Sequence, residues 1–261
     1  MDNGLFFIGR RCRIQIMQRA FRCDLHIHTC LSPCADLGMY PRAIVNKAMA
    51  EHLDIIAICD HNASENVPCV QKLAQGTGLT VLPGMEINTS EEVHLLALFD
   101  RFEDLERLQT LIYEHLPGKN NEDVFGCQAI VNEQDEVEGF NERLLIGATE
   151  LSLEQWIDHI HRFGGLAVAS HIDRESFSVI SQLGFIAEDV PFDALEVSRR
   201  TGIQGGRLKY PELAARPMFT ASDAHAISAI GQGLTMIYLR GATTAELKLA
   251  FESRMGRQIR E

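Results

Sequence analysis

The chain has 261 residues, which suffices for one α/β barrel or two smaller domains with a substantial buried core. A hydrophobic content of 46% with 23% charged residues is typical of a globular enzyme and excludes a disordered or fibrous chain. The formal net charge of −12 argues against extended nonspecific binding of duplex nucleic acid but permits anionic substrates, and no apolar run approaches the length of a membrane span.

The seven cysteines form no compact framework, and their odd number favours a reducing, cytoplasmic location over a disulfide scaffold. Cys30 and Cys34 are set apart because they lie between His28 and Asp36, in a loop that we expect to face the functional site. Either they pack that loop as reduced thiols, which is the favoured interpretation, or they ligate a soft metal.

The N-terminal part is predicted to be a basic leader, residues 1–22, of little structural consequence, followed by a single domain over residues 23–261. The first strand is expected at 23–27. A helix opened by proline follows at 41–51, with Ile44, Val45, Ala48 and Met49 on one stripe. The next expected elements are a strand at 54–59, a helix capped by Ser64 that runs to Ala74, and a strand at 79–82.

The same alternation continues to the C-terminus. Helices are predicted at 102–115, at 152–163 before the Gly164-Gly165 stop, and at 243–255, with strands at 166–170, 194–197, 218–221 and 234–239. Such alternation predicts a parallel sheet, and seven or so strands predict its closure into a barrel.

One segment, at about 117–149, interrupts the alternation. Asn, Gly and acidic residues surround two short apolar runs at 129–131 and 144–146, so we interpret the segment as an inserted, hairpin-like excursion. It either shapes substrate entry or is a surface insertion without a role.

Histidines and carboxylates recur at the ends of the predicted strands. His26 and His28 are two residues apart on a strand, so both side chains can reach one cation, and Asp24 shares their face. Further histidines and carboxylates stand at the start or just after the end of the later predicted strands: Asp60, His61, Glu86, His94, His171, Asp223 and His225. This repetition predicts a multinuclear metal site.

Six motifs together resemble the polymerase and histidinol phosphatase (PHP) family. They are DLHIHT at 24–29, AICDHN at 57–62, PGMEI at 83–87, EVHLL at 92–96, ASHIDR at 169–174 and ASDAH at 221–225. The resemblance runs from about Cys23 to Arg257. It implies a distorted seven-stranded, TIM-like (β/α) barrel with two or three divalent metals at the carboxyl ends of the strands, where barrel chemistry is generally found.

The resemblance also implies three sets of metal ligands. The first is His26, His28, Glu86 and Asp223; the second is Glu86, as a bridge, with His94 and His171; the third is Asp36, His61 and His225. Mixed imidazole and carboxylate donors suit Mn²⁺, Fe²⁺ or Zn²⁺ alike. Asp60 is expected to orient a ligand. The compact HTxxSDG stretch of many relatives is longer here, which moves Asp36 away from its usual spacing.

Several further polar residues have two interpretations each. Arg174, Arg199 and Arg200 either hold a substrate phosphate or form surface salt bridges. Glu196 either lines the floor of the site or is a buried, paired carboxylate. The histidines outside the motifs are expected to be structural: His52, His115, His159 and His161.

The resulting hypothesis is a metal-dependent phosphoesterase that hydrolyses a small phosphomonoester or nucleotide through metal-activated water. Glu86, Asp60 and Arg174 are its candidate catalytic residues, with Arg174 near the third metal to hold the phosphate. The runner-up is a phosphodiesterase or exonuclease on short oligonucleotides. Two rival hypotheses are a sensor of metal and phosphate ligand without turnover and a C–N hydrolase, and the oligomeric state is left open.

Overall fold

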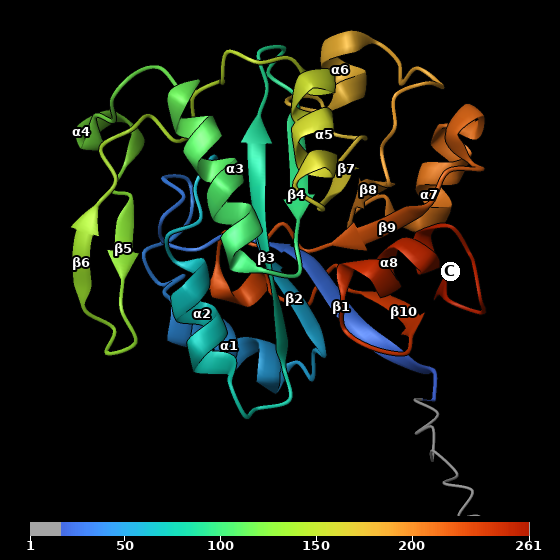
Figure 1. The fold of residues 1–261 in the computed structure, drawn as a ribbon, viewed down its shortest axis with the longest axis horizontal. Helices are drawn as coiled ribbons and strands as arrows, with labels where there is room; N and C mark the ends of the chain where they lie inside the picture. The colour runs from blue at the N-terminus through green and yellow to red at the C-terminus, as the bar shows by residue number, and fades with distance from the viewer. Residues whose placement is uncertain (1–16, 261) are drawn as a thin grey trace, which may run out of the picture.

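A nine-stranded sheet curls into a nearly closed barrel in the computed structural model, which describes residues 17–260 (Figure 1). Its strands are β1 (Arg19–Ile27), β2 (Ile55–Ile58), β3 (Thr80–Asn88), β4 (His94–Leu98), β7 (Leu166–Ala169), β8 (Ala194–Ser198), β9 (Met218–Ala221), β10 (Thr235–Leu239) and β11 (Gln258–Arg260). They are hydrogen-bonded in the order β11-β10-β1-β2-β3-β4-β7-β8-β9. A bridge between Ile27 and Ala224 brings the chain after β9 back beside β1.

The strand directions differ in part from the predicted parallel sheet. The series β1-β2-β3 and β7-β8-β9 are parallel, but β4 is antiparallel to both of its neighbours, and β10 and β11 pair antiparallel at the edge. Only residues 89–93 connect β3 to β4, and so short a connection permits a hairpin but no helical crossover. With nine strands in the sheet, the expected count of seven is not confirmed.

Helices cover the outer face of the barrel (Figure 1). They are α1 (Pro41–Ala50), α2 (Val67–Ala74), α3 (Phe102–Glu114), α5 (Leu153–Arg162), α6 (Val179–Leu183), α7 (Gly202–Lys209) and α8 (Thr244–Phe251), with 3-10 turns at Pro211–Leu213 and Ile227–Ala229. The predicted helices at 41–51, 102–115 and 152–163 are confirmed to within a residue at each end. The helix expected from Ser64 begins at Val67, and the one expected to reach residue 255 ends at Phe251.

Alternation along each strand separates two apolar layers. In β2, Ile55 and Ala57 face the barrel interior, whereas Ile56 and Ile58 belong to the layer beneath the helices. Both layers are buried, so β2 has no exposed residue and reads as a continuous apolar run. The interior layer determines where the functional side chains point.

The first strand begins earlier than predicted. β1 starts at Arg19 and pairs with β10 from there onward, so residues 19–22 of the predicted leader are part of the sheet. Residues 1–16, which make up most of that leader, lie outside the described residues.

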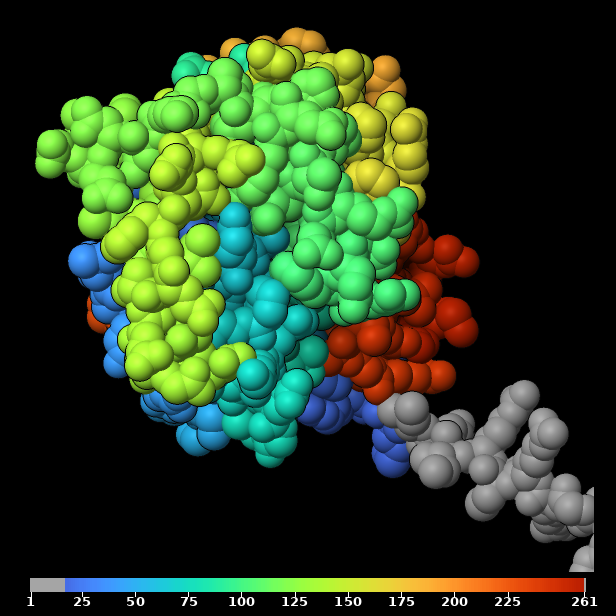
Figure 2. All heavy atoms as spheres, turned by 60° about the vertical axis from the view of Figure 1, so that its left-hand side comes forward, coloured from blue at the N-terminus to red at the C-terminus, as the bar shows by residue number. Residues whose placement is uncertain are grey.

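The excursion at 117–149 contains a short helix, α4 (Glu122–Phe125), and a hairpin of β5 (Ala129–Val131) and β6 (Val137–Phe140). The second apolar run of this segment, at 144–146, forms no strand. Figure 2 shows the hairpin, in yellow-green, on the outside of the molecule beside the cyan segment that contains α2. Asn66 ties it to the barrel: its Oδ1 accepts from the Val131 N–H at 2.9 Å and its Nδ2 donates to the Ala129 carbonyl at 3.0 Å.

No helix within residues 17–260 combines the length and the apolar character needed to cross a membrane.

Candidate metal centre

The interior layer of the barrel continues directly into a polar centre at one end. In β3, Leu82 and Gly84 face the interior, and Glu86 follows two residues later on the same face. In β9 and its extension, Phe219 and Ala221 are followed in the same way by Asp223. The period of two along each strand therefore places both carboxylates above the interior apolar layer.

A bulge places the first histidine. Cys23 and Leu25 of β1 face the interior, so a regular strand would continue with Ile27, yet Ile27 packs in the outer layer. The pairing of β1 with β2 shifts register between Asp24 and Ile27, and such an irregularity re-aims side chains. His26 thereby turns inward. Asp24 does not join it, because its carboxylate accepts from the backbone N–H groups of Ser222 and Gly231, both at 2.8 Å.

Glu86 lies at the middle of the centre and is 1% exposed. Its two oxygens face five imidazoles. Oε1 lies 3.5 Å from His26 Nε2, 3.1 Å from His94 Nδ1 and 3.2 Å from His171 Nε2, and Oε2 lies 3.4 Å from His28 Nε2 and 3.2 Å from His61 Nδ1. A single carboxylate shared by so many potential ligands has the geometry that the predicted bridging role requires.

Asp223 provides the second carboxylate. Its Oδ1 lies 3.4 Å from His26 Nε2 and 3.2 Å from His28 Nε2, and its Oδ2 forms an ion pair with the exposed guanidinium of Arg174. Asp223 and His171 both have positive φ, 47° and 23°, which is uncommon outside glycine. These conformations lie where the strands end, and strained backbone of this kind clusters at functional sites.

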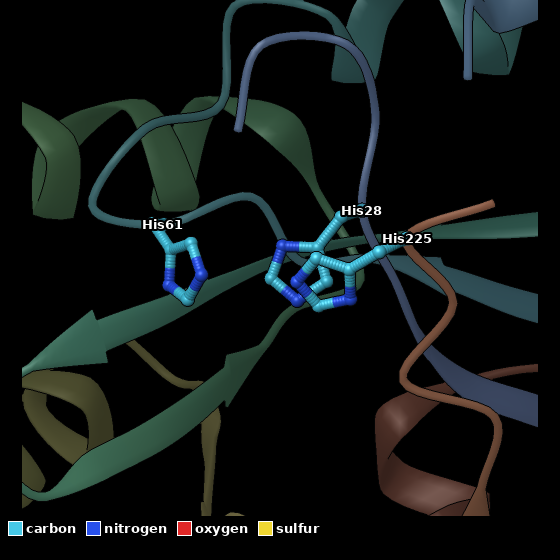
Figure 3. Close-up of side chains that lie close together, drawn as sticks. All are labelled: His28, His61 and His225. Carbon is cyan, nitrogen blue, oxygen red and sulfur yellow. The ribbon is translucent and has the colours of Figure 1, made fainter. Parts of the chain in front are cut away.

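The ligand atoms fall into three groups, each with all atoms within 4.8 Å of one another. The groups are His26, His28 and Asp223; His61, Glu86 and His94; and His28, His61 and His225. Figure 3 shows the third group, in which His61 approaches from the opposite side to His28 and His225. The groups share members, so they form one continuous centre. Eight of the nine predicted ligands gather here, since His171 contacts Glu86 even though it belongs to none of the three groups.

The ninth predicted ligand, Asp36, is placed differently. It is exposed, and none of the three groups found within residues 17–260 includes its carboxylate. Its contact with the centre is through the backbone, where its N–H donates to the His225 carbonyl at 2.8 Å. The longer loop between His28 and Asp36 accounts for this change of position.

Hydrogen bonds fix the ring tautomers of three histidines. His26 Nδ1 donates to Glu196 Oε2 at 2.9 Å, and His225 Nδ1 donates to the Asp223 carbonyl at 3.0 Å, because these oxygens can only accept. Each bond engages Nδ1 and leaves Nε2 as the ring nitrogen that a ligand ion could reach. Glu196 is therefore a buried carboxylate that is paired with His26 and lies beneath the metal centre, so both interpretations given for it above apply.

The third tautomer is fixed by a relay. His28 Nδ1 lies 2.9 Å from Ser32 Oγ, which donates onward to Asp60 Oδ1 at 2.6 Å. Asp60 also accepts from the Thr29 N–H and hydroxyl, each at 2.7 Å. It thus orients His28 through Ser32, in agreement with the role expected for it. The importance of Ser32 was missed, because a serine four residues after a histidine carries no distinctive signal.

Burial and mutual charge set the protonation of the centre. Burial alone would lower the pKa of His26, but the carboxylates of Glu196, Asp223 and Glu86 outweigh it and hold that pKa well above its ordinary value. Burial would raise the pKa of Glu86, but His94 and His26 hold it well below its usual range. Burial, followed by the charge of His28, lowers the pKa of His225 to about 4.

The donor set fits divalent transition metals. Several buried polar atoms of the centre make no hydrogen bond of acceptable geometry, although three of them lie close to an opposite charge: His61 Nδ1, His94 Nδ1 and Asp223 Oδ1, together with the outer nitrogen of His171, Nδ1. Orphaned groups of this kind require an explanation such as an ion. Imidazole nitrogens and carboxylate oxygens that converge in a buried space are the ligands of Mn²⁺, Fe²⁺ or Zn²⁺, so the residues present fit the predicted cofactors.

The remaining arginines and histidines named in the sequence analysis are not among the ligand groups of the centre within residues 17–260. The Arg199 guanidinium contacts Gln232, and Arg200 is exposed. His161 pairs with Asp193 at 2.8 Å and His115 with Glu150 at 3.5 Å, both outside the centre, which agrees with their expected structural roles.

The chain aligns with curated proteins over most of its length in one case and over a short segment in another. Over 225 residues the chain is 27% identical to the 5'-3' exoribonuclease Rnm of Salmonella typhimurium, covering 67% of this chain and 74% of that protein. A 5'-3' exoribonuclease of Haemophilus influenzae is 30% identical over 82 residues. The chain spans only 29% of the length of the latter relative.

Solved structures share the fold. The lesion-specific endonuclease EndoQ of Pyrococcus furiosus superposes with a TM-score of 0.66 at 15% identity, covering 92% of this chain and 58% of that one. A putative metal-dependent phosphoesterase of Bifidobacterium adolescentis superposes with a TM-score of 0.53 at 20% identity, covering 78% of this chain and 87% of the other. At these identities the likeness concerns the fold alone.

The model of the PHP domain family matches residues 24–182, a stretch that begins at the first motif and contains Glu86, His94 and His171. The predicted resemblance is thereby confirmed, and the expectation of an enzyme that hydrolyses phosphoric esters agrees with the names of the curated relatives, which are exoribonucleases. The chain belongs to the PHP domain family.

Proposed function

We propose that this protein hydrolyses the first internucleotide phosphodiester of a short oligonucleotide and so releases nucleotides from its 5′ end. The observation that carries the proposal is the buried Glu86, shared by five imidazoles in one centre. The names of the curated relatives, which are 5'-3' exoribonucleases, favour the oligonucleotide. The small phosphomonoester or nucleotide expected first from the sequence is the second candidate.

Burial of the centre favours an end over the middle of a polymer. Glu86, His26 and His28 are at most 1% exposed, and His94 and Asp223 are 8% and 9% exposed. The phosphodiester next to a strand end can enter so deep a centre together with the terminal nucleotide, whereas an internal ester of a long strand would have to bend both flanking segments into it. The net charge of −12 also opposes the tracking of a long polyanion.

Bound divalent ions would supply an activated water and neutralise charge on the phosphoryl oxygens. His26, His28, His61, His94, His171, His225, Glu86 and Asp223 are the residues that would hold them. The protein's own part is to keep the Nε2 lone pairs of His26 and His28 directed inward, through Glu196 and the Ser32 to Asp60 relay. No separate general acid is identifiable among the residues of the centre.

Arg174 provides the phosphate-binding group at the mouth. One guanidinium nitrogen pairs with Asp223, and the side chain is 46% exposed, so further N–H groups can donate to a phosphoryl oxygen. We expect Arg174→Ala to lower kcat/KM by roughly 10- to 100-fold, because a charge-assisted hydrogen bond is lost, with metal content unchanged. Steady-state kinetics and elemental analysis measure the two quantities.

Arg240→Ala is the matched control, because Arg240 is also exposed but follows β10 at the other end of the barrel. Loss of metal in Arg174→Ala would assign Arg174 to the integrity of the centre, and unchanged kinetics would remove it from the phosphate-binding role.

The deciding experiment is a substrate panel in Mn²⁺: a 5′-phosphorylated RNA tetranucleotide, its 5′-hydroxyl counterpart, a nucleoside monophosphate and nitrophenyl phosphate. Mass spectrometry should show mononucleotides that appear stepwise from the 5′ end, and a folded His28→Ala variant should lack this activity. Release of inorganic phosphate from the monoesters alone would establish the second candidate. No turnover on any substrate by the metal-loaded protein would contradict both and favour the sensor or C–N hydrolase.

A further inference from the structure

A half-buried phenylalanine lies against the metal centre instead of in the core. The ring of Phe177 stacks on that of His94, with centroids 4.7 Å apart and planes 17° from parallel. Within residues 17–260, Phe177 belongs to none of the three apolar clusters, and it is not among the half-buried hydrophobic side chains that pack against them. Apolar packing of the fold therefore does not account for the position of this ring.

The backbone of Phe177 is held in an unfavourable conformation. Its φ is +56°, which is uncommon for a bulky side chain. Hydrogen bonds hold the segment in place: the Phe177 carbonyl accepts from the His94 N–H at 2.9 Å, and the Ser178 hydroxyl donates to the Arg174 carbonyl at 2.8 Å. Strain of this kind costs free energy and persists where the surrounding structure fixes it, commonly at sites that bind a ligand.

The loop that carries Phe177 also carries Arg174, and the two side chains lie against different walls of the centre. Arg174 pairs with Asp223, which follows β9, whereas Phe177 covers His94, the first residue of β4. One loop thus supplies a cation and an apolar ring to the entrance. A ligand with an anionic group beside a flat apolar group matches this pair.

A nucleotide is such a ligand. The terminal nucleotide enters the centre with the phosphodiester next to it, so its base must lie against a wall of the entrance. Stacking on an aromatic side chain is the common way in which proteins hold a single-stranded base, and it works for every base because each has a π face. The phenylalanine ring has no hydrogen-bonding group, so it cannot select one base over another.

We infer that Phe177 is the platform on which the 5′-terminal base stacks, while Arg174 holds the phosphate beside it. The inference rests on the proposed function for the identity of the ligand. It makes the enzyme selective for nucleotides over phosphoric esters that lack a base, without selection among the four bases. Phe177 contributes to binding and takes no part in the cleavage of the ester.

Substrates with and without the terminal base test the inference. The metal-loaded protein should cleave a 5′-phosphorylated RNA tetranucleotide with a kcat/KM about tenfold higher than the same oligonucleotide without its 5′-terminal base. Phe177→Leu should remove this preference by raising KM for the substrate that has the base, and Phe177→Trp should retain it. Phe185→Leu is the matched control, because Phe185 is an exposed phenylalanine in the segment that follows α6.

Binding of inert analogues gives a second measurement that needs no turnover. Analogues of AMP and ribose 5-phosphate in which a methylene group replaces the ester oxygen cannot lose their phosphorus group by hydrolysis. Isothermal titration calorimetry measures their affinities for the Mn²⁺-loaded protein. The base should strengthen binding about tenfold in the wild type and in Phe185→Leu, and hardly at all in Phe177→Leu.

A preference for the base that survives in Phe177→Leu would overturn the inference. Loss of metal, or of kcat on both substrates, in Phe177→Leu would also overturn it, because that result assigns Phe177 to the positioning of His94. A wild-type protein that binds the base but cleaves no oligonucleotide would refute the proposed function and support the platform. Cleavage from the 5′ end without regard to the terminal base would refute the platform and support the proposed function.

Discussion

The two ends of the barrel satisfy the hydrogen-bonding groups of their polar side chains to different degrees. At the metal centre, His61, His94 and His171 each keep a buried nitrogen without a hydrogen-bond partner. At the other end, two half-buried aspartates and one exposed aspartate each accept two or more hydrogen bonds or ion pairs. Asp54 accepts from the Arg22 N–H and the Arg19 guanidinium; Asp100 from the Thr244 N–H and hydroxyl; and Asp193 from the Ala167 N–H, His161 and Lys248.

This contrast separates function from stability. A buried polar group without a partner costs free energy, so a cluster of them is retained only where a ligand satisfies it. Paired aspartates at strand and helix ends stabilise the fold directly. The contrast agrees with the general division of barrel proteins, in which the carboxyl ends of the strands carry chemistry and the opposite face carries stability.

Glu86→Gln should have the largest effect on the metal centre, because it removes the charge that faces five imidazoles. We expect bound metal to fall and activity to decrease on the order of 10³-fold. Elemental analysis and the oligonucleotide assay measure the two effects. Glu138→Gln, an exposed carboxylate of β6, is the matched control. A folded Glu86→Gln protein with full metal content would show that the centre is wrongly assigned.

Glu196→Ala should have a smaller effect, because Glu196 acts through His26. Loss of the bond to His26 Nδ1 frees the ring to rotate or change tautomer, and we expect metal affinity to fall by roughly 10- to 100-fold. Competition with a chelator measures the affinity. Glu196→Gln keeps an acceptor oxygen and should recover most of it. Equal losses in the two variants would indicate that charge, and not orientation, is what Glu196 contributes.

Asp193→Asn tests the stabilising end. Burial would raise the pKa of Asp193, but its bonds to His161, the Ala167 N–H and Lys248 outweigh burial and lower it. A carboxylate with a lowered pKa contributes stability above its ordinary pKa and loses that contribution as pH falls through the folded value. We therefore expect Asp193→Asn to cost about 1–3 kcal/mol in the free energy of unfolding at pH 5.5.

The difference from the wild type should begin to shrink as pH falls through the ordinary aspartate pKa of about 3.9, where the unfolded carboxylate becomes protonated, and it is lost only below the lowered pKa of the folded state. Urea denaturation of both proteins at pH 5.5 and pH 3 measures it, and metal content should not change. A difference independent of pH would mean that shape, and not charge, makes Asp193 stabilising.

The sequence by itself determined the features that depend on local periodicity. Short apolar runs located the core strands, and the period of two along a strand placed Glu86 and Asp223 on the interior face two residues beyond Gly84 and Ala221. Motif order was enough to predict the family and eight residues of the centre. These properties follow from strand geometry, which each short segment expresses independently of the rest of the chain.

Only the tertiary structure decided what depends on distant segments. The short connection reverses β4, a register shift in β1 turns His26 inward, and Glu196 meets His26 although 170 positions separate them in the chain. The loop after His28 likewise exposes Asp36, because Ser32 and the Asp36 backbone are hydrogen-bonded to residues that follow other strands. Local sequence cannot specify such placements, since they arise from hydrogen bonds and packing between segments that meet only in the closed barrel.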